Sequence, residues 1–231
     1  MGNDKKRLSQ ALTVRIITSA CLLIAFAVFT VAVTAADVRP VGADGTDIGL
    51  AGLNTAVRDA VGYSPVLFAV SEYLGYIALA VMAFFAGVGL VRLIRGRSLK
   101  AVGSEIWLTG GFYVLLLAVY LLFEKLEINY RPLKLEGELE ASYPSSHTVL
   151  ALCVFLSAAL LFAKLLASKP KAAAALQIAM TVLALATVVT RFTSGVHWFT
   201  DIIGGVILSA LLLSLYSLAG YAIGERSAEE S

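Results

Sequence analysis

The chain has 231 residues, of which 59% are hydrophobic and only 15% are charged, and its mean hydropathy is +0.85. Soluble domains carry about 25% charged residues, so this composition excludes an ordinary soluble protein and indicates one that folds in lipid. The formal net charge is only +2 and the basic residues are dispersed, so we expect no nucleic-acid partner.

Six stretches are apolar enough to cross a bilayer, which requires about 20 residues of helix. They cover roughly residues 12–35, 65–91, 105–123, 148–168, 172–190 and 202–223. We therefore predict an all-α fold: a polytopic membrane helical bundle of about six transmembrane helices, forming a single membrane-embedded domain over residues 1–231.

The first stretch can also be interpreted as a signal peptide. It follows the charged segment MGNDKKR and ends in AVTAAD, whose small residues are typical of a cleavage site. The apolar run is longer than the hydrophobic region of most signal peptides, which favours a retained span. Cleavage would leave five spans without changing the side that the later loops face.

The distribution of Lys and Arg predicts the orientation in the membrane. If the N-terminus is cytoplasmic, most of the 18 basic residues fall on the cytoplasmic side, as the positive-inside rule requires. The short loops RLIRGRSLK and KPK make this signal local. We therefore expect both termini to be cytoplasmic and residues 36–64, 124–147 and 191–201 to face outward.

Residues 36–64 form the longest predicted outer loop. Leu50, Leu53 and Val57 within it recur at helical spacing. This pattern is typical of an amphipathic helix that lies on the membrane surface. The segment is therefore either a plain extracytoplasmic loop or an amphipathic lid.

The outer loop before the fourth span ends in YPSSH. Pro144 is favourable at a helix start, and Ser145 or Ser146 can cap that helix. Free backbone N–H groups at a helix N-terminus bind anions such as phosphate, and His147 would lie beside such an anion. The alternative is a capped helix with a histidine at the membrane interface.

The outer segment RFTSGVHWFTD contains the second of the chain's two histidines. His197 and Asp201 are four residues apart, so on a helix they share one face. A carboxylate that binds one imidazole nitrogen fixes the tautomer and leaves the other nitrogen free to attack. The alternative is that Asp201 only caps the sixth span, although it could do both.

Three cations near span ends are candidates to bind phosphate. Arg131 and Arg191 offer planar guanidinium groups that bind phosphate oxygens in pairs. Both could instead reach toward lipid headgroups. Lys125 directly follows LLFE and could simply anchor the end of its span.

These residues together resemble the three signature blocks of the type 2 phosphatidic acid phosphatases, also called lipid phosphate phosphatases. That family has Lys, six residues and Arg-Pro, then Pro-Ser-Gly-His, then Ser-Arg, five residues, His, three residues and Asp. The corresponding blocks are KLEINYRP at 125–132, PSSH at 144–147 and TRFTSGVHWFTD at 190–201. The third block has its Arg, His and Asp at the family's spacing.

The resemblance implies a role for each residue. His197 would be the nucleophile that forms a phosphohistidine, Asp201 would orient it, and His147 would be the general acid. A separate set would hold the phosphate, with backbone N–H groups of the 145–147 turn: Arg131, Arg191, Lys125, Ser145 and, through its added hydroxyl, Ser146. Water would then release the phosphate, and no metal or other cofactor would be needed because these cations stabilise the charge.

Three positions depart from the family pattern. Only five residues separate Lys125 from Arg131, and Glu124 stands where the family has its lysine. Ser146 replaces a glycine, and Thr190 replaces a serine while keeping the hydroxyl. None of these changes removes an acid, a base or a nucleophile.

The implied function is dephosphorylation of a lipid phosphate at the outer face of a cell membrane. A polyprenyl pyrophosphate of bacterial cell-wall synthesis is the favoured substrate, and phosphatidic acid and phosphatidylglycerol phosphate are close rivals. One alternative is a phosphotransferase of the same family with a lipid or sugar acceptor. Another is a non-catalytic lipid carrier or flippase, for which Glu72 is the main intramembrane charge.

Overall fold

The computed structural model describes residues 2–229, with side chains for residues 10–224. This part of the chain contains seven α-helices and no β-strand. The helices are α1 (Gly2–Ala35), α2 (Ala51–Val61), α3 (Pro65–Gly96), α4 (Ser104–Leu126), α5 (Ser146–Leu165), α6 (Pro170–Thr193) and α7 (Phe199–Glu229). All except α2 are long and apolar enough to cross a membrane, which confirms an all-helical fold with six candidate spans.

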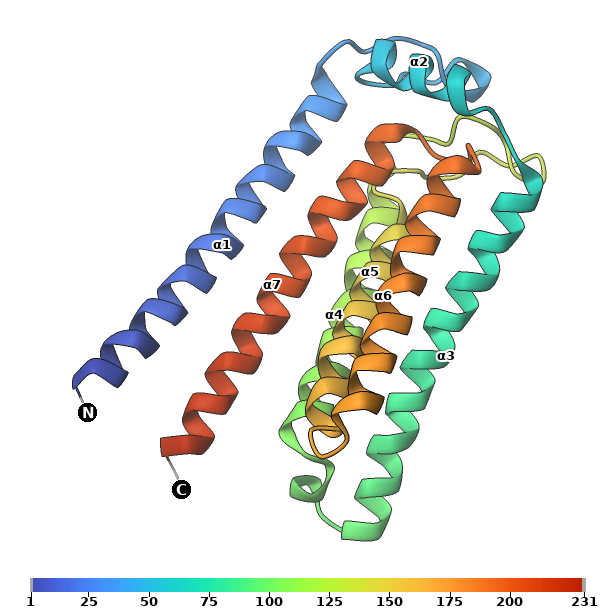
Figure 1. Ribbon diagram of the computed structural model, residues 1–231. Helices are drawn as coiled ribbons and strands as arrows, with labels where there is room; N and C mark the ends of the chain where they lie inside the picture. The colour runs from blue at the N-terminus through green and yellow to red at the C-terminus, as the bar shows by residue number, and fades with distance from the viewer. Residues whose placement is uncertain (1, 230–231) are drawn as a thin grey trace.

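The helices pack around α5. This helix contacts α3, α4, α6 and α7. In its most apolar 18-residue segment 56% of the residues are buried inside the protein, whereas the corresponding value for α3 is 11%. Helix α1 packs along α7 at the edge of the bundle (Figure 1). Both ends of the described chain lie at one end of the bundle, and α2 lies across the opposite end.

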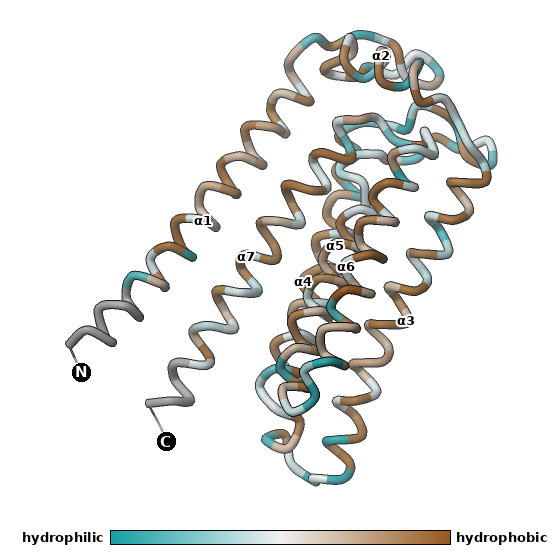
Figure 2. Tube along the Cα trace, viewed as in Figure 1, coloured by the Kyte–Doolittle hydropathy of each residue, from teal (hydrophilic) through white to brown (hydrophobic). Residues whose placement is uncertain are grey.

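The outward faces of the spans are apolar, as lipid contact requires. Large side chains such as Val66, Val114 and Ile178 are 65–70% exposed. Hydrophilic residues gather in the loops at the two ends of the bundle (Figure 2). This pattern is the reverse of a soluble protein's surface, because the solvent for these faces is hydrocarbon.

The end of the bundle that carries α2 is held together by backbone contacts between distant loops. The backbone N–H of Ser64 donates to the carbonyl of Ser194 over 3.0 Å. Gly195 has a φ of +72°, and a Cβ there would lie 1.8 Å from the carbonyl oxygen of Gly62. Only glycine permits this approach, which fixes the loop before α7 against the start of α3.

Candidate active site

The start of α5 is capped by Ser145. Its hydroxyl accepts hydrogen bonds from the hydroxyl of Thr148 at 3.0 Å and from the backbone N–H of Thr148 at 3.4 Å. Its own backbone N–H donates to the carbonyl of Asp201 over 3.0 Å. The capping role predicted for either serine therefore belongs to Ser145, and this residue also joins the second and third signature blocks.

Asp201 lies in the first turn of α7 and is completely buried. Its carboxylate accepts from the backbone N–H of Trp198 at 2.9 Å, which caps the helix start. It also accepts from Asn129 Nδ2 at 3.1 Å and from the hydroxyl of Ser142. Asp201 is thus a helix cap and also the centre of a buried polar network.

His197 meets this network through Ser142. The Ser142 Oγ lies 3.1 Å from His197 Nδ1, whereas the Asp201 Oδ2 lies 3.4 Å away. Because Ser142 donates to Asp201, it accepts from His197 Nδ1–H, which leaves Nε2 unprotonated. The sequence predicted a contact between the histidine and the aspartate; the structure has this pair at 3.4 Å and adds the hydroxyl of Ser142, which lies closer to the histidine.

The free nitrogen of His197 has the character of a nucleophile. Nε2 is buried and has no hydrogen-bond partner among the described residues. Burial, followed by the nearby charges of Arg131 and Arg191, lowers the pKa of His197 well below its usual value. The imidazole is therefore neutral at physiological pH, with its lone pair on Nε2.

Arg191 is fully buried in the last turn of α6, and α3 binds one side of its guanidinium group. Nη1 lies 3.1 Å from Ser71 Oγ and 2.6 Å from Glu72 Oε1. Within the described chain, Nε and Nη2 have no hydrogen-bond partner. These two nitrogens form the edge with which an arginine binds two oxygens of one phosphate.

The same carboxylate oxygen also contacts His147. Glu72 Oε1 lies 3.2 Å from His147 Nε2. The other ring nitrogen, Nδ1, is buried without a hydrogen-bond partner in the described part of the protein. The structure therefore brings His147 and Arg191 together through a residue of α3 that the signature blocks do not include.

Arg131 lies in the loop between α4 and α5 and is 8% exposed. Its Nε is 2.9 Å from Glu140 Oε2, and its Nη1 lacks a hydrogen-bond partner among the described residues. Lys125 is exposed and does not line the cavity beside Arg131, whereas Glu124 does. The structure thus brings Arg131 to the site but not Lys125.

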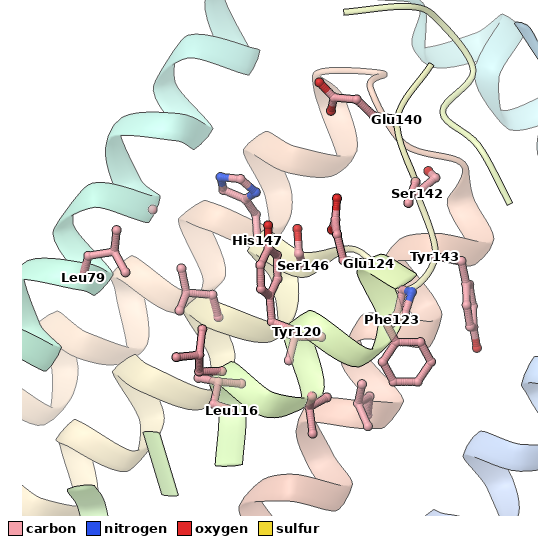
Figure 3. Close-up of a pocket in the computed structure, with 18 of the residues that line it drawn as sticks. Leu79, Leu116, Tyr120, Phe123, Glu124, Glu140, Ser142, Tyr143, Ser146 and His147 are labelled. Carbon is pink, nitrogen blue, oxygen red and sulfur yellow. The ribbon is translucent and has the colours of Figure 1, made fainter. Parts of the chain in front are cut away.

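A cavity of about 580 Å³ opens between α3, α4, α5 and the loop after α4 (Figure 3). Its polar end is lined by Glu72, Arg131, Ser142, Ser146 and His147. Its apolar part is lined by side chains such as Leu79, Leu116, Leu117, Val119 and Phe123. His197 and Arg191 lie directly behind the polar wall, in contact with Ser142 and Glu72.

Sequence reasoning missed three parts of this site. Ser142 lies two residues before the second signature block, and Asn129 is one of the unspecified residues between Lys125 and Arg131 in the first block. Glu72 gave a detectable signal, since a carboxylate within an apolar span is usually functional. Its partners could not be identified because they lie 75 and 119 residues away along the chain.

The polar groups suit an anion. The described residues contain no group of three or more His, Cys, Asp or Glu side chains arranged to hold a metal. They do contain two nearly buried guanidinium groups with unpaired N–H donors facing the histidine network. A phosphate group has the charge and the acceptor oxygens to bind these donors.

The comparisons with known proteins agree with this geometry. Residues 122–224 match the model of the PAP2 superfamily. This match supports a lipid phosphatase at the level of the superfamily. No curated protein shows detectable sequence similarity to the chain.

One solved structure with the same fold is the first transmembrane PAP2 type phosphatidylglycerolphosphate phosphatase from Bacillus subtilis. The TM-score is 0.59 and the sequence identity is 21%. The similarity covers 87% of this chain and 94% of that one. The fold is therefore shared along almost the whole length of both proteins.

Proposed function

We propose that the protein hydrolyses lipid phosphates through a phosphohistidine intermediate on His197, without a metal ion. The observation that carries this proposal is the unpaired, buried Nε2 of a neutral histidine beside unpaired guanidinium donors. A neutral imidazole can attack phosphorus, and the cations stabilise the charge on the phosphoryl oxygens during transfer.

In the first step, His197 Nε2 attacks the phosphorus atom of the lipid phosphate. The bond from phosphorus to the lipid oxygen breaks, and the leaving oxygen takes a proton from His147. Arg191 and Arg131 hold the phosphoryl oxygens. The polar network that ends on Asp201 stabilises the positive charge that His197 acquires.

In the second step, water attacks the phosphohistidine. His147, now deprotonated, accepts a proton from that water, and the bond from Nε2 to phosphorus breaks. Inorganic phosphate leaves, and both histidines return to their initial state. A lipid phosphate monoester thus yields the lipid alcohol and phosphate, and a lipid diphosphate yields the lipid monophosphate and phosphate.

The cavity supports a substrate with a long apolar chain. Its walls are mostly apolar side chains of α3 and α4, beyond the polar end where His147 lies (Figure 3). A polyprenyl diphosphate and phosphatidylglycerol phosphate both have such a chain and a terminal phosphate. The second is the substrate for which the structural relative from Bacillus subtilis is named.

We further propose that the site faces the outside of the cell and acts on the outer leaflet. The support is the excess of Lys and Arg at the opposite end of the bundle, such as Arg92 and Arg95 at the end of α3 and Lys100 just after it. Residues 36–64 would then cover the outer end of the bundle with helix α2.

Glu72 bears on the carrier alternative. An intramembrane carboxylate on a transport path would favour a lipid carrier. Here its oxygen contacts His147 and Arg191, so a role in the phosphate site explains its presence. This contact favours an enzyme over a carrier.

The test is phosphate release by purified protein in excess EDTA, with polyprenyl, glycerolipid and sphingoid phosphates. We expect phosphate release from at least one of them. The unaltered protein should also form an acid-labile phosphoprotein, the phosphohistidine intermediate, and His197→Ala should abolish both the release and this intermediate. Glu105→Gln, which alters an ion pair with Arg92 away from the cavity, is the matched control. Phosphate found on an added alcohol instead would identify a phosphotransferase, and turnover by His197→Ala would contradict the mechanism.

A further inference from the structure

One face of α3 is built around the two site residues that approach it. Ser71 and Glu72 bind Arg191, and Gly75 lies one turn further along the same helix. This helix lies outside residues 122–224, the part that matches the superfamily. The site therefore depends on a helix that carries none of the signature residues.

Gly75 makes room for His147 on this face. A Cβ at position 75 would lie 3.0 Å from His147 Cδ2 and 3.3 Å from Nε2. These distances are too short for ordinary packing, so the imidazole lies directly against the backbone of α3. In this position its Nε2 reaches Glu72 Oε1 at 3.2 Å.

The two histidines are held in complementary ways. Ser142 and Asp201 occupy the Nδ1 side of His197 and leave Nε2 unpaired. Glu72 occupies the Nε2 side of His147 and leaves Nδ1 unpaired and buried. Each histidine thus has one nitrogen next to a carboxylate and the other available for chemistry.

We infer that Glu72 is a positioning residue that orients His147 so that Nδ1 donates the proton to the leaving group. This inference rests on the proposed function. The carboxylate accepts the Nε2–H bond, which fixes the ring and stabilises the imidazolium form. Its bond to Arg191 Nη1 leaves the Nε and Nη2 edge of Arg191 for the phosphate.

The proton balance of the first step follows from this arrangement. His147 begins with protons on both nitrogens. As the bond from phosphorus to the lipid oxygen breaks, that oxygen takes the Nδ1 proton, and His147 remains neutral with its Nε2–H bonded to Glu72. In the second step Nδ1 takes a proton from the attacking water.

The test compares two leaving groups. An alkyl phosphate such as phosphatidic acid needs a proton on its leaving oxygen, whereas p-nitrophenyl phosphate has a stable leaving group and does not. A general acid contributes about 10²–10⁴-fold to the rate, so we expect Glu72→Gln to lower alkyl phosphate turnover by at least ~10²-fold. Turnover of p-nitrophenyl phosphate should fall far less, and His147→Ala should show the same selectivity.

Ser71→Ala is the matched control, because it removes a contact to Arg191 from the same helix but none to His147. We expect it to affect both substrates equally. The inference would be overturned if Glu72→Gln lowered the turnover of both substrates equally, or lowered the turnover of neither. If the unaltered protein released no phosphate from either substrate, the proposed function itself would fail.

Discussion

At the scale of single residues, the site depends on short polar bridges in a buried setting. Ser142 joins His197 to Asp201, and Glu72 joins His147 to Arg191. One partner in each bridge is buried, such as Asp201 and Arg191, so a lost contact leaves a buried polar group without compensation. Substitutions here should therefore change the chemistry more than the binding of the lipid chain.

The bridge through Ser142 predicts the effect of Ser142→Ala. Without the hydroxyl, the Nδ1–H of His197 loses its acceptor in the ground state and in the phosphorylated state. A hydrogen bond to a charged group contributes about 1.5–3 kcal/mol, so kcat should fall about 10-fold to 100-fold with little change in KM. Rapid-quench measurement of phosphohistidine formation checks this.

Two variants control the Ser142 prediction. Ser142→Thr keeps the hydroxyl and should recover much of the rate. Asn129→Ala removes another contact of Asp201 without touching His197, so its loss should be smaller. A Ser142→Ala protein with unaltered kcat would show that Asp201 acts on His197 directly.

The low pKa of His197 predicts the acidic side of the pH profile. The attacking form is neutral, and a pKa well below 6.5 keeps it neutral as the pH falls through 6.5. The acid limb of kcat/KM should therefore lie below pH 6.5. Arg131 is one cause of the lowered pKa, so Arg131→Gln should move this limb to higher pH.

Substrate ionisation is the same for both proteins in this comparison, so only the shift between them reports on His197. The profiles can be measured with one lipid phosphate in one detergent. An acid limb that Arg131→Gln leaves in place, or moves to lower pH, would contradict the assignment.

The family resemblance and the structure predict different roles for Lys125, because the resemblance implies that it binds phosphate. Its side chain is exposed and does not line the cavity, whereas Arg131 does. Lys125→Ala should therefore change kcat/KM little, while Arg131→Ala should lower it strongly by removing a phosphate-binding cation. Comparable losses in the two variants would show that Lys125 reaches the substrate.

At the scale of elements, the loops outside the spans are tied to the helices that carry the site. Asn54 of α2 is fully buried and bonds to α7 through Thr200, accepting from its backbone N–H at 3.2 Å and donating to its hydroxyl at 3.0 Å. Asp201 follows directly in α7. Helix α2 is thus fastened to the turn that positions the nucleophile, which limits its freedom as a lid.

This attachment predicts that Asn54→Ala destabilises the protein. It leaves the buried N–H of Thr200 without a partner, which costs about 1–3 kcal/mol in free energy of unfolding. Thermal unfolding in detergent should show a lower midpoint. Leu53→Ala, one residue away and 47% exposed, is the control and should be close to neutral; equal midpoints for the two variants would contradict the role of Asn54.

At the scale of the whole molecule, six spans place both described ends of the chain at one end of the bundle and the site at the other (Figure 1). The charge distribution predicts which end is cytoplasmic. In a Cys21→Ala background, Glu138→Cys should react with a membrane-impermeant maleimide in intact cells. Lys100→Cys should react only after the cells are opened, and the reverse pattern would invert the orientation.

The sequence by itself determined the six candidate spans and predicted the main residues of the candidate site. Spans follow from local hydropathy, because lipid requires each helix to satisfy its own backbone hydrogen bonds. His197 and Asp201 could be paired because helical spacing links neighbours along the chain. Arg191, Arg131 and His147 were found as polar residues where apolar spans begin or end.

Only the tertiary structure decided the contacts between distant segments and the direction in which each side chain points. Successive residues on a helix differ by about 100° in direction, so at the end of α4 Glu124 lines the cavity while its neighbour Lys125 does not. Ser142 enters the His197 network, and Glu72 meets His147 and Arg191, because packing places α3, α5, α6 and α7 side by side. No local pattern in the sequence encodes such pairs, since their members are separated by dozens of residues and meet only when the helices pack.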